Sequence, residues 1–105
     1  MENRELCAFF RAGKYSFSKH AERERQADKI TFGELEEALN DCEIIEEYRS
    51  DPRGTSCLVL GFCGLRPIHA VCALKANPDE VLIITVYDPS KRSHKWTRGY
   101  RSRKE

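Results

Sequence analysis

The sequence predicts an α+β domain, with helices packed on one face of a mainly antiparallel sheet of four or five strands. In the first 40 residues apolar side chains recur at helical spacing, and from residue 42 onward apolar and polar residues alternate as in strands. The connections between these strands are too short to hold crossover helices, so successive strands should pair as hairpins. A chain of 105 residues fits one domain with a single core.

The first helix is expected over residues 4–12. Its apolar face would be formed by Leu6, Phe9 and Phe10, and Gly13 follows as a stop signal. The next segment, "KYSFS", alternates polar and aromatic residues, which is typical of a brief strand. We expect this strand to add to an edge of the sheet.

Two further helices begin with capping residues. Ser18 is placed to cap a helix that starts at Lys19, so His20 lies in its first turn, with the charged residues 22–25 spread around an exposed surface. Thr31 and Glu34 have capping-box spacing and begin a third helix that ends near residue 40. The apolar face of this third helix would consist of Phe32, Leu35, Ala38 and Leu39.

Four strands are expected after residue 41, separated by the turn sequences "SDPRG", "GLRP" and "NPDE". They cover residues 42–49, 55–63, 68–76 and 80–88. Strict alternation in the third strand puts His69 on the face opposite the apolar row Ile68, Ala70, Cys72 and Leu74. In the last strand Thr85 and Tyr87 share that open face with His69, whereas the helices would pack on Leu82, Ile84 and Val86.

The cysteines indicate a reducing compartment. There are five of them, an odd number without a C-x-x-C pair, so neither a disulfide framework nor a zinc knuckle is suggested. We expect buried, reduced thiols in a soluble, cytoplasmic protein without a membrane span. The three histidines, His20, His69 and His94, show no spacing typical of metal ligands, so no metal and no cofactor are predicted.

Charge is unevenly distributed along the chain. Residues 34–51 hold eight acidic side chains, whereas residues 91–104 hold seven lysines and arginines and no acid. In the basic tail, Trp96 and Tyr100 can stack on unpaired bases while the cations neutralise phosphates. The alternatives are that the tail is solvated, or that it pairs with acidic residues of the same chain or of a protein partner.

The open face of the sheet is the candidate site. A metal-independent ribonuclease must deprotonate a 2′-hydroxyl, stabilise a crowded phosphorane and protonate the departing 5′-oxygen. His69 and Tyr87 are the candidate catalytic residues, and the candidate RNA- or phosphate-binding residues are Lys91, Arg92, Trp96 and Arg98. The alternative is that His69 and Tyr87 are ordinary residues of a half-exposed sheet. His20 is interpreted as structural, since the positive end of a helix disfavours its protonated form.

A family resemblance rests on two long segments. "PRGTSCLVLGFCGLRPIHAVCALK" and "VLIITVYDPSKRSHKW", together with "KHA" and "ITFGELEEAL", resemble a functionally uncharacterised family of small bacterial domains related to RelE/ParE-like toxins. The resemblance covers about residues 16–96 and departs from the family pattern at Glu24 and Asp28, where arginines are usual. It implies a RelE-like fold, which we assign to residues 15–90. The first helix lies outside the resemblance and forms a helical extension (1–14), and the composition of residues 91–105 predicts a basic, flexible tail.

The resemblance also implies classes of function. RelE relatives cleave ribosome-bound messenger RNA, whereas ParE relatives bind DNA gyrase, and such toxins are usually neutralised by a small antitoxin protein. We therefore expect a toxin-like domain of a toxin–antitoxin system that acts on RNA as an endoribonuclease, with RNA or the ribosome and an antitoxin as partners. The alternative is a protein-binding module without catalytic activity.

Overall fold

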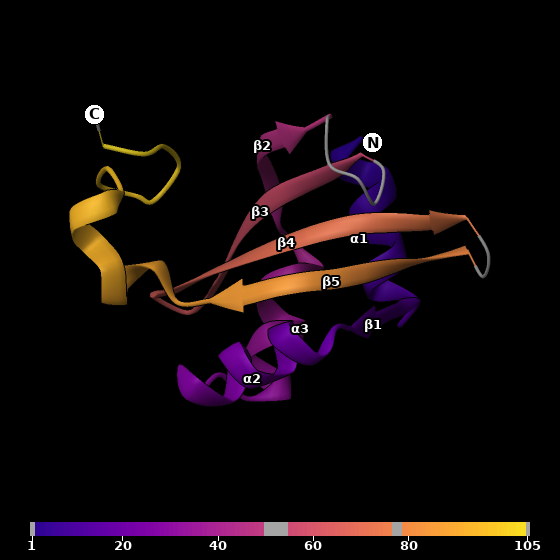
Figure 1. Ribbon diagram of the computed structural model, residues 1–105, viewed down its shortest axis with the longest axis horizontal. Coiled ribbons are helices and arrows are strands. Elements are labelled where there is room, and N and C mark those ends of the chain that lie inside the picture. Colours follow the sequence, from indigo (N-terminus) through magenta and orange to yellow (C-terminus); the bar gives the residue numbers. More distant parts are fainter. Residues whose placement is uncertain (1, 50–54, 77–78, 105) are drawn as a thin grey trace.

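The structure is a computed structural model that describes residues 2–49, 55–76 and 79–104, and it has the predicted α+β architecture (Figure 1). The elements are α1 (Asn3–Arg11), β1 (Tyr15–Phe17), α2 (Lys19–Ala27), α3 (Phe32–Asn40), β2 (Glu43–Tyr48), β3 (Ser56–Cys63), β4 (Arg66–Ala76), β5 (Asp79–Tyr87) and the 3₁₀ segment η1 (Pro89–Lys95). The five strands form one sheet in the order β1-β5-β4-β3-β2. In this sheet β1 pairs with β5 in parallel, and the other pairs are antiparallel.

Both predicted helix caps are formed. The hydroxyl of Ser18 accepts a hydrogen bond from the backbone N–H of Ala21 at 3.0 Å, which starts α2. Thr31 and Glu34 form the complete capping box of α3. The predicted edge strand is also confirmed, because β1 lies at one end of the sheet beside β5. The predicted turn 50–54 lies outside the described residues, as do residues 77 and 78 of the next turn.

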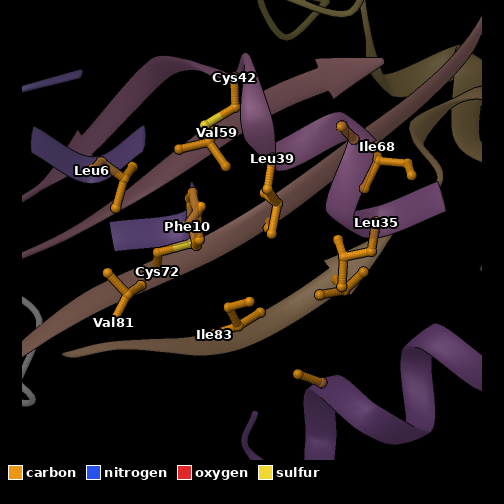
Figure 2. Packing of buried hydrophobic residues seen from close by; sticks show 14 of the residues in the cluster. Leu6, Phe10, Leu35, Leu39, Cys42, Val59, Ile68, Cys72, Val81 and Ile83 are labelled. Atoms are coloured by element: carbon orange, nitrogen blue, oxygen red, sulfur yellow. The ribbon is translucent and has the colours of Figure 1, made fainter. Parts of the chain in front are cut away.

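The core lies between the three α-helices and one face of the sheet (Figure 2). Apolar side chains of all three helices pack there against alternate residues of β3, β4 and β5; the labelled ones include Leu6, Phe10, Leu35, Leu39, Val59, Ile68, Val81 and Ile83. All five cysteines are free thiols, as expected, and four of them are buried: Cys7, Cys42, Cys57 and Cys72. α1 contributes Leu6, Cys7 and Phe10 to the same core as the other two helices.

The predicted alternation of β5 is wrong because the strand contains an irregularity. In the pairing of β4 with β5, Val71 lies opposite Thr85 but Cys72 lies opposite Ile83, so Ile84 has no partner in the register. The extra residue changes which side chains face the helices: the core contains Val81, Ile83 and Val86 in place of the predicted Leu82, Ile84 and Val86. Such bulges invert the period-two pattern on one side of the insertion.

Two predictions about the surface of α2 and α3 also need correction. Phe32 was expected in the core but is 56 % exposed. Arg25 was expected on an exposed surface but is buried, because its guanidinium lies 3.8 Å from the centre of the Phe32 ring and donates to the Ile30 carbonyl at 2.6 Å. An ion pair with Glu22 completes the contacts of this arginine. Arg25 therefore packs across the junction between the two helices.

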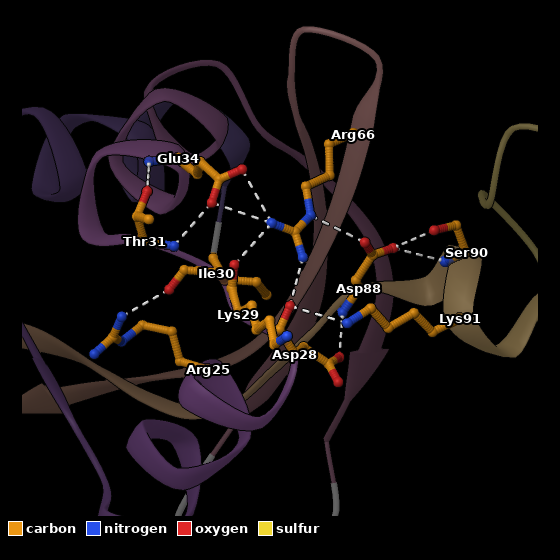
Figure 3. A network of polar contacts seen from close by, with 10 residues as sticks. All are labelled: Arg25, Asp28, Lys29, Ile30, Thr31, Glu34, Arg66, Asp88, Ser90 and Lys91. Atoms are coloured by element: carbon orange, nitrogen blue, oxygen red, sulfur yellow. Dashed lines mark hydrogen bonds and ion pairs between the residues drawn. The ribbon is translucent and has the colours of Figure 1, made fainter.

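A polar network around Arg66 joins the start of β4 to the end of β5, to the turn between α2 and α3, and to the first turn of α3 (Figure 3). The guanidinium Nε donates to Asp88 Oδ2 at 3.0 Å, and Nη1 donates to both carboxylate oxygens of Glu34 at 3.1 and 3.0 Å. Nη1 also donates to the backbone carbonyl of Lys29 at 3.0 Å, and Nη2 donates to that of Asp28 at 2.6 Å. Lys29 has a left-handed backbone (φ 55°), so the network fixes a strained turn between α2 and α3.

Within the described part of the chain, none of the helices has the length and apolar character needed to span a membrane.

Candidate functional site

The two residues predicted to be catalytic are neighbours on adjacent strands. His69 in β4 lies opposite Tyr87 in β5, and His69 Nδ1 is 3.1 Å from the Tyr87 hydroxyl oxygen. Their rings meet edge to face, with centroids 5.2 Å apart. The prediction that these side chains share the face opposite the core is confirmed, since neither residue belongs to the core cluster under the helices.

The prediction that this face is open is wrong at His69. The imidazole is fully buried, because the ring of Trp96 lies 4.4 Å away and the backbone carbonyl of Tyr100 lies 3.0 Å from Nε2. Trp96, expected to stack on bases from a flexible tail, is only 3 % exposed. Its indole fills the space over the sheet and is not accessible to a base in this arrangement.

The hydrogen bonds of His69 define its protonation state. A carbonyl can only accept, so Nε2 carries the proton and donates it to Tyr100. Burial lowers the pKa of His69 to about 4, which keeps the ring neutral at physiological pH and leaves Nδ1 to accept from the Tyr87 hydroxyl. Burial also raises the pKa of Tyr87 to about 12, so the phenol remains protonated.

The stability of the domain is expected to fall by about 2 kcal/mol between about pH 7.5 and pH 5 through His69 alone. The pKa of this imidazole decreases on folding from 6.5 to about 4, so between these values the unfolded chain binds more protons than the folded one. The contribution is complete above pH 6.5 and is lost as the pH falls toward 4. Urea denaturation of the wild type and of His69→Gln at pH 7.5 and pH 5 measures this contribution. If both proteins lost the same free energy of unfolding, the lowered pKa of His69 would be contradicted.

A half-buried pair of side chains, Glu46 and Tyr48, lies beside the histidine. Glu46 in β2 accepts hydrogen bonds from Arg103 Nε at 3.0 Å and Nη2 at 3.2 Å, and from the hydroxyl of Tyr48. Burial raises the pKa of Glu46, but these hydrogen bonds outweigh it, so the pKa lies below its ordinary value. The carboxylate is therefore ionised, and its negative charge favours a proton on His69.

A pocket of about 220 Å³ opens next to Tyr87. Its lining combines three cationic side chains with one carboxylate, an alcohol and two aromatic rings: Arg92, Lys95, Arg103, Glu24, Thr85, Tyr87 and Trp96. The guanidinium of Arg92 lies 5.6 Å from the centre of the Tyr87 ring, and that of Arg103 lies 4.7 Å from the centre of the Trp96 ring. The excess of positive charge suits an anion of about the size of a phosphodiester.

The other predicted phosphate-binding residues do not line this pocket. Lys91 donates to the backbone carbonyl of Asp28 at 3.1 Å, and Arg98 is exposed. Arg92 is the one of the predicted set that both lines the pocket and remains partly exposed, and it also lies 3.7 Å from the Asp28 carboxylate. Within the described ranges, histidine, cysteine, aspartate and glutamate side chains nowhere gather in a group that could hold a metal ion.

His20, predicted to be structural, is connected to the sheet through a second residue. Its imidazole is mostly exposed, with Nε2 3.1 Å from the carboxylate of Glu24. The same carboxylate oxygen accepts a hydrogen bond from the backbone N–H of Val86 at 3.2 Å. The imidazole itself does not line the pocket, although Glu24 does.

Several residues of the site were not predicted from the sequence. Glu46 and Tyr48 hydrogen-bond to each other on β2. Strict alternation would put both on the core face with Cys42 and Ile44, and the register shift between Ile44 and Glu46 changes this phase, so alternation alone could not have placed them near His69. No sequence pattern indicates Lys95 or Arg103, which reach the pocket from η1 and from the chain after it. Tyr100 was expected to stack on bases, but its contribution is the backbone carbonyl that contacts His69.

Comparison with known proteins places most of the domain in a family. The model of the family described as domain of unknown function (DUF4258) matches residues 17–88. The chain belongs to the DUF4258 family. No curated protein and no solved structure matches the chain. The expected resemblance to a functionally uncharacterised family is therefore confirmed, whereas its relation to RelE/ParE-like toxins stays a prediction.

The DUF4258 match divides the candidate site into two parts. His69, Tyr87 and Glu46 lie inside the matched segment. η1 and the chain that follows it lie outside, and they contribute Arg92, Lys95, Trp96 and Arg103 to the pocket. The sheet residues therefore belong to the DUF4258 domain, and the cationic wall is added by the C-terminal part of this chain.

Proposed function

We propose that this protein is a toxin-like domain that acts on RNA as a metal-independent endoribonuclease, with a phosphodiester bound in the pocket beside Tyr87. The observation that carries the proposal is the hydrogen bond between His69 and Tyr87 at the wall of a pocket with three cations. Arginine and lysine side chains attract a phosphate and neutralise the charge that develops on it in the transition state.

The proposed reaction is a transesterification. The 2′-oxygen forms a bond to phosphorus while the bond from phosphorus to the 5′-oxygen breaks, which leaves a 2′,3′-cyclic phosphate. The proton of the 2′-hydroxyl passes to the oxygen of Tyr87 as the phenolic proton passes to Nδ1 of His69, the unprotonated nitrogen. The nearby carboxylate of Glu46 stabilises the imidazolium that forms. Lys95 supplies a proton to the departing 5′-oxygen, since arginine does not release its proton.

A non-catalytic, protein-binding module is the second candidate. Both ring nitrogens of His69 are already engaged within the chain, as in a purely structural histidine. In addition, the turn between β3 and β4 presents Leu65, which is 98 % exposed, next to Phe62, which is 40 % exposed. Exposed apolar side chains at a turn are a suitable contact for a protein such as a small antitoxin.

The test uses the purified chain, end-labelled RNA and isolated ribosomes, in the presence of a metal chelator. We expect wild type to cleave RNA to 2′,3′-cyclic phosphate ends and Tyr87→Phe to be about 100-fold slower or worse, because general acid–base groups contribute at least this much. Arg92→Gln should weaken RNA binding. His20→Ala is the matched control, since its imidazole is exposed outside the pocket, and it should cleave like wild type.

Intact RNA with and without ribosomes, together with undiminished growth on expression, would overturn the ribonuclease proposal. Capture of a protein partner by wild type but not by Leu65→Ser would then favour the protein-binding module. Thermal melting of each variant separates a loss of function from a loss of folding.

A further inference from the structure

The chain after η1 forms a small closed loop over His69. The backbone N–H of Thr97 donates to the Ser102 carbonyl at 2.8 Å, and Trp96 and Arg103 form an isolated antiparallel bridge. Within the loop, Gly99 (φ 89°) and Tyr100 (φ 63°) are both left-handed. This pair of unusual conformations accompanies the contact of the Tyr100 carbonyl with Nε2 of His69. Residues 97–104 are called the cover below.

The cover is attached to β2 through exposed ion pairs. Arg101 Nε lies 2.6 Å from the carboxylate of Glu43, and Arg103 binds Glu46 through two nitrogens. The arginine side chains are 62 % and 56 % exposed. Ion pairs at this exposure hold weakly and are screened by salt. Figure 1 shows the C-terminal chain, in yellow, beyond the end of β5 and apart from the three α-helices.

The same arginines are suited to RNA. A guanidinium binds a phosphate through two parallel hydrogen bonds, as it binds a carboxylate, so phosphates compete directly with Glu43 and Glu46 for it. Arg103 is placed for such an exchange, because it lines the pocket beside Tyr87 and also forms the ion pair with Glu46 that holds the cover. A phosphodiester in the pocket is thus placed next to one of the two attachments of the cover.

We infer that the cover is a segment that RNA displaces: Arg101 and Arg103 exchange their carboxylates for phosphates, the Tyr100 carbonyl leaves Nε2, and His69 becomes accessible. This inference rests on the proposed action on RNA. In the covered state Nε2 is occupied by the Tyr100 carbonyl and the ring is fully buried. In the uncovered state both arginines contact the ligand. RNA therefore binds the uncovered state more tightly and shifts the population toward it.

The accessibility of His69 can be measured directly with diethyl pyrocarbonate, which modifies imidazole nitrogens, followed by mass spectrometry of peptides. His20 and His94 are exposed and act as references within the same molecule. In wild type we expect His69 to react much more slowly than both. The double variant Arg101→Gln/Arg103→Gln should react about three- to tenfold faster at His69, because two exposed ion pairs are lost.

Two further arms complete the experiment. The matched control, Arg98→Gln/Lys104→Gln, removes the same charge from exposed positions of the cover and should keep the wild-type rate. Raising the salt concentration from about 0.05 M to 0.5 M should accelerate modification of His69 in wild type, which requires no variant to fold. Adding a single-stranded uridine oligonucleotide at low salt should likewise accelerate modification of His69 in wild type.

The outcomes distinguish the inference from the proposed function. An unchanged rate at His69 in the Arg101/Arg103 double variant and at high salt would show that these pairs do not hold the cover, and would overturn the inference. The inference alone also fails if the oligonucleotide binds wild type but His69 stays protected. If the oligonucleotide does not bind at all, the proposed action on RNA fails together with displacement by RNA.

Discussion

Replacing Gly61 with alanine is expected to lower the free energy of unfolding by about 3 kcal/mol, the upper end of the usual cost of overpacking. Gly61 lies in β3 directly under α3. A β-carbon at this position would be 2.1 Å from the carbonyl oxygen of Ala38 and 2.7 Å from its carbonyl carbon. These are backbone atoms and cannot rotate away, so α3 must move off the sheet and lose part of its packing.

The matched control is Gly33→Ala in the first turn of α3. There the added β-carbon would meet only the Thr31 side-chain oxygen, at 3.9 Å. Alanine is the better helix former, so this variant should be as stable as wild type or more stable by up to about 1 kcal/mol. Urea denaturation of the three proteins measures the difference. Equal stability of the two variants would mean that α3 does not approach β3 as closely as described.

Local sequence patterns predicted most of the elements because the interactions that define them are local. The caps at Ser18 and Thr31 involve hydrogen bonds to residues three positions away, and such spacings are visible in a sequence. Alternation placed His69 and Tyr87 on one face correctly, because the register between them is regular at that end of the sheet. The pair at the centre of the candidate site was therefore predictable.

The irregularity of β5 was not predictable in the same way. It inserts one residue, Ile84, into a run of apolar residues, where either phase of the alternation is equally hydrophobic. The hydroxyl of Ser18 donates to the Ile84 carbonyl at 2.9 Å, and the backbone N–H of Ser18 donates to the Ile83 carbonyl at 2.9 Å. The backbone carbonyls at the bulge thus accept hydrogen bonds from a residue 66 positions before Ile84, which no local pattern reveals.

The arrangement of the basic tail also depends on distant residues. Of the alternatives compatible with its composition, pairing with acidic residues of the same chain is confirmed by Arg101 on Glu43 and Arg103 on Glu46. Trp96 packs against His69 just before the segment that carries Arg101 and Arg103 to β2. Composition alone describes the charge of the tail, whereas the fold decides which carboxylates lie within reach.

Arg66→Met is expected to lower the free energy of unfolding by about 3 kcal/mol, the usual cost of removing one partner from a buried ion pair. Asp88 is buried, and Arg66 together with Ser90 supplies its hydrogen bonds. Burial raises the pKa of Asp88, and the bonds from Ser90 and Arg66 outweigh this effect and lower it. Without the arginine, Glu34 also loses its charged partner at the start of α3.

This variant should also weaken the proposed RNA binding, since the network leads to the pocket. Asp88 caps η1 through the backbone N–H of Ser90 at 2.9 Å, and its own backbone N–H donates to the Asp28 carboxylate at 2.9 Å. Arg92, on the pocket wall, lies 3.7 Å from the same carboxylate. Loss of Arg66 therefore loosens the turn at Asp28 and the start of η1 together, and with them the position of Arg92.

Arg49→Met is the control for Arg66→Met, because Arg49 is 86 % exposed and its ion pair with Glu47 spans 3.7 Å. It should change stability by less than about 0.5 kcal/mol. Arg66→Lys keeps the charge but cannot reach the two carboxylates and two carbonyls at once, so its stability should fall between wild type and Arg66→Met. If Arg66→Lys is as stable as wild type, charge alone stabilises the network and the forked geometry of the guanidinium is unnecessary. If Arg66→Met is as stable as Arg49→Met, the network does not stabilise the fold.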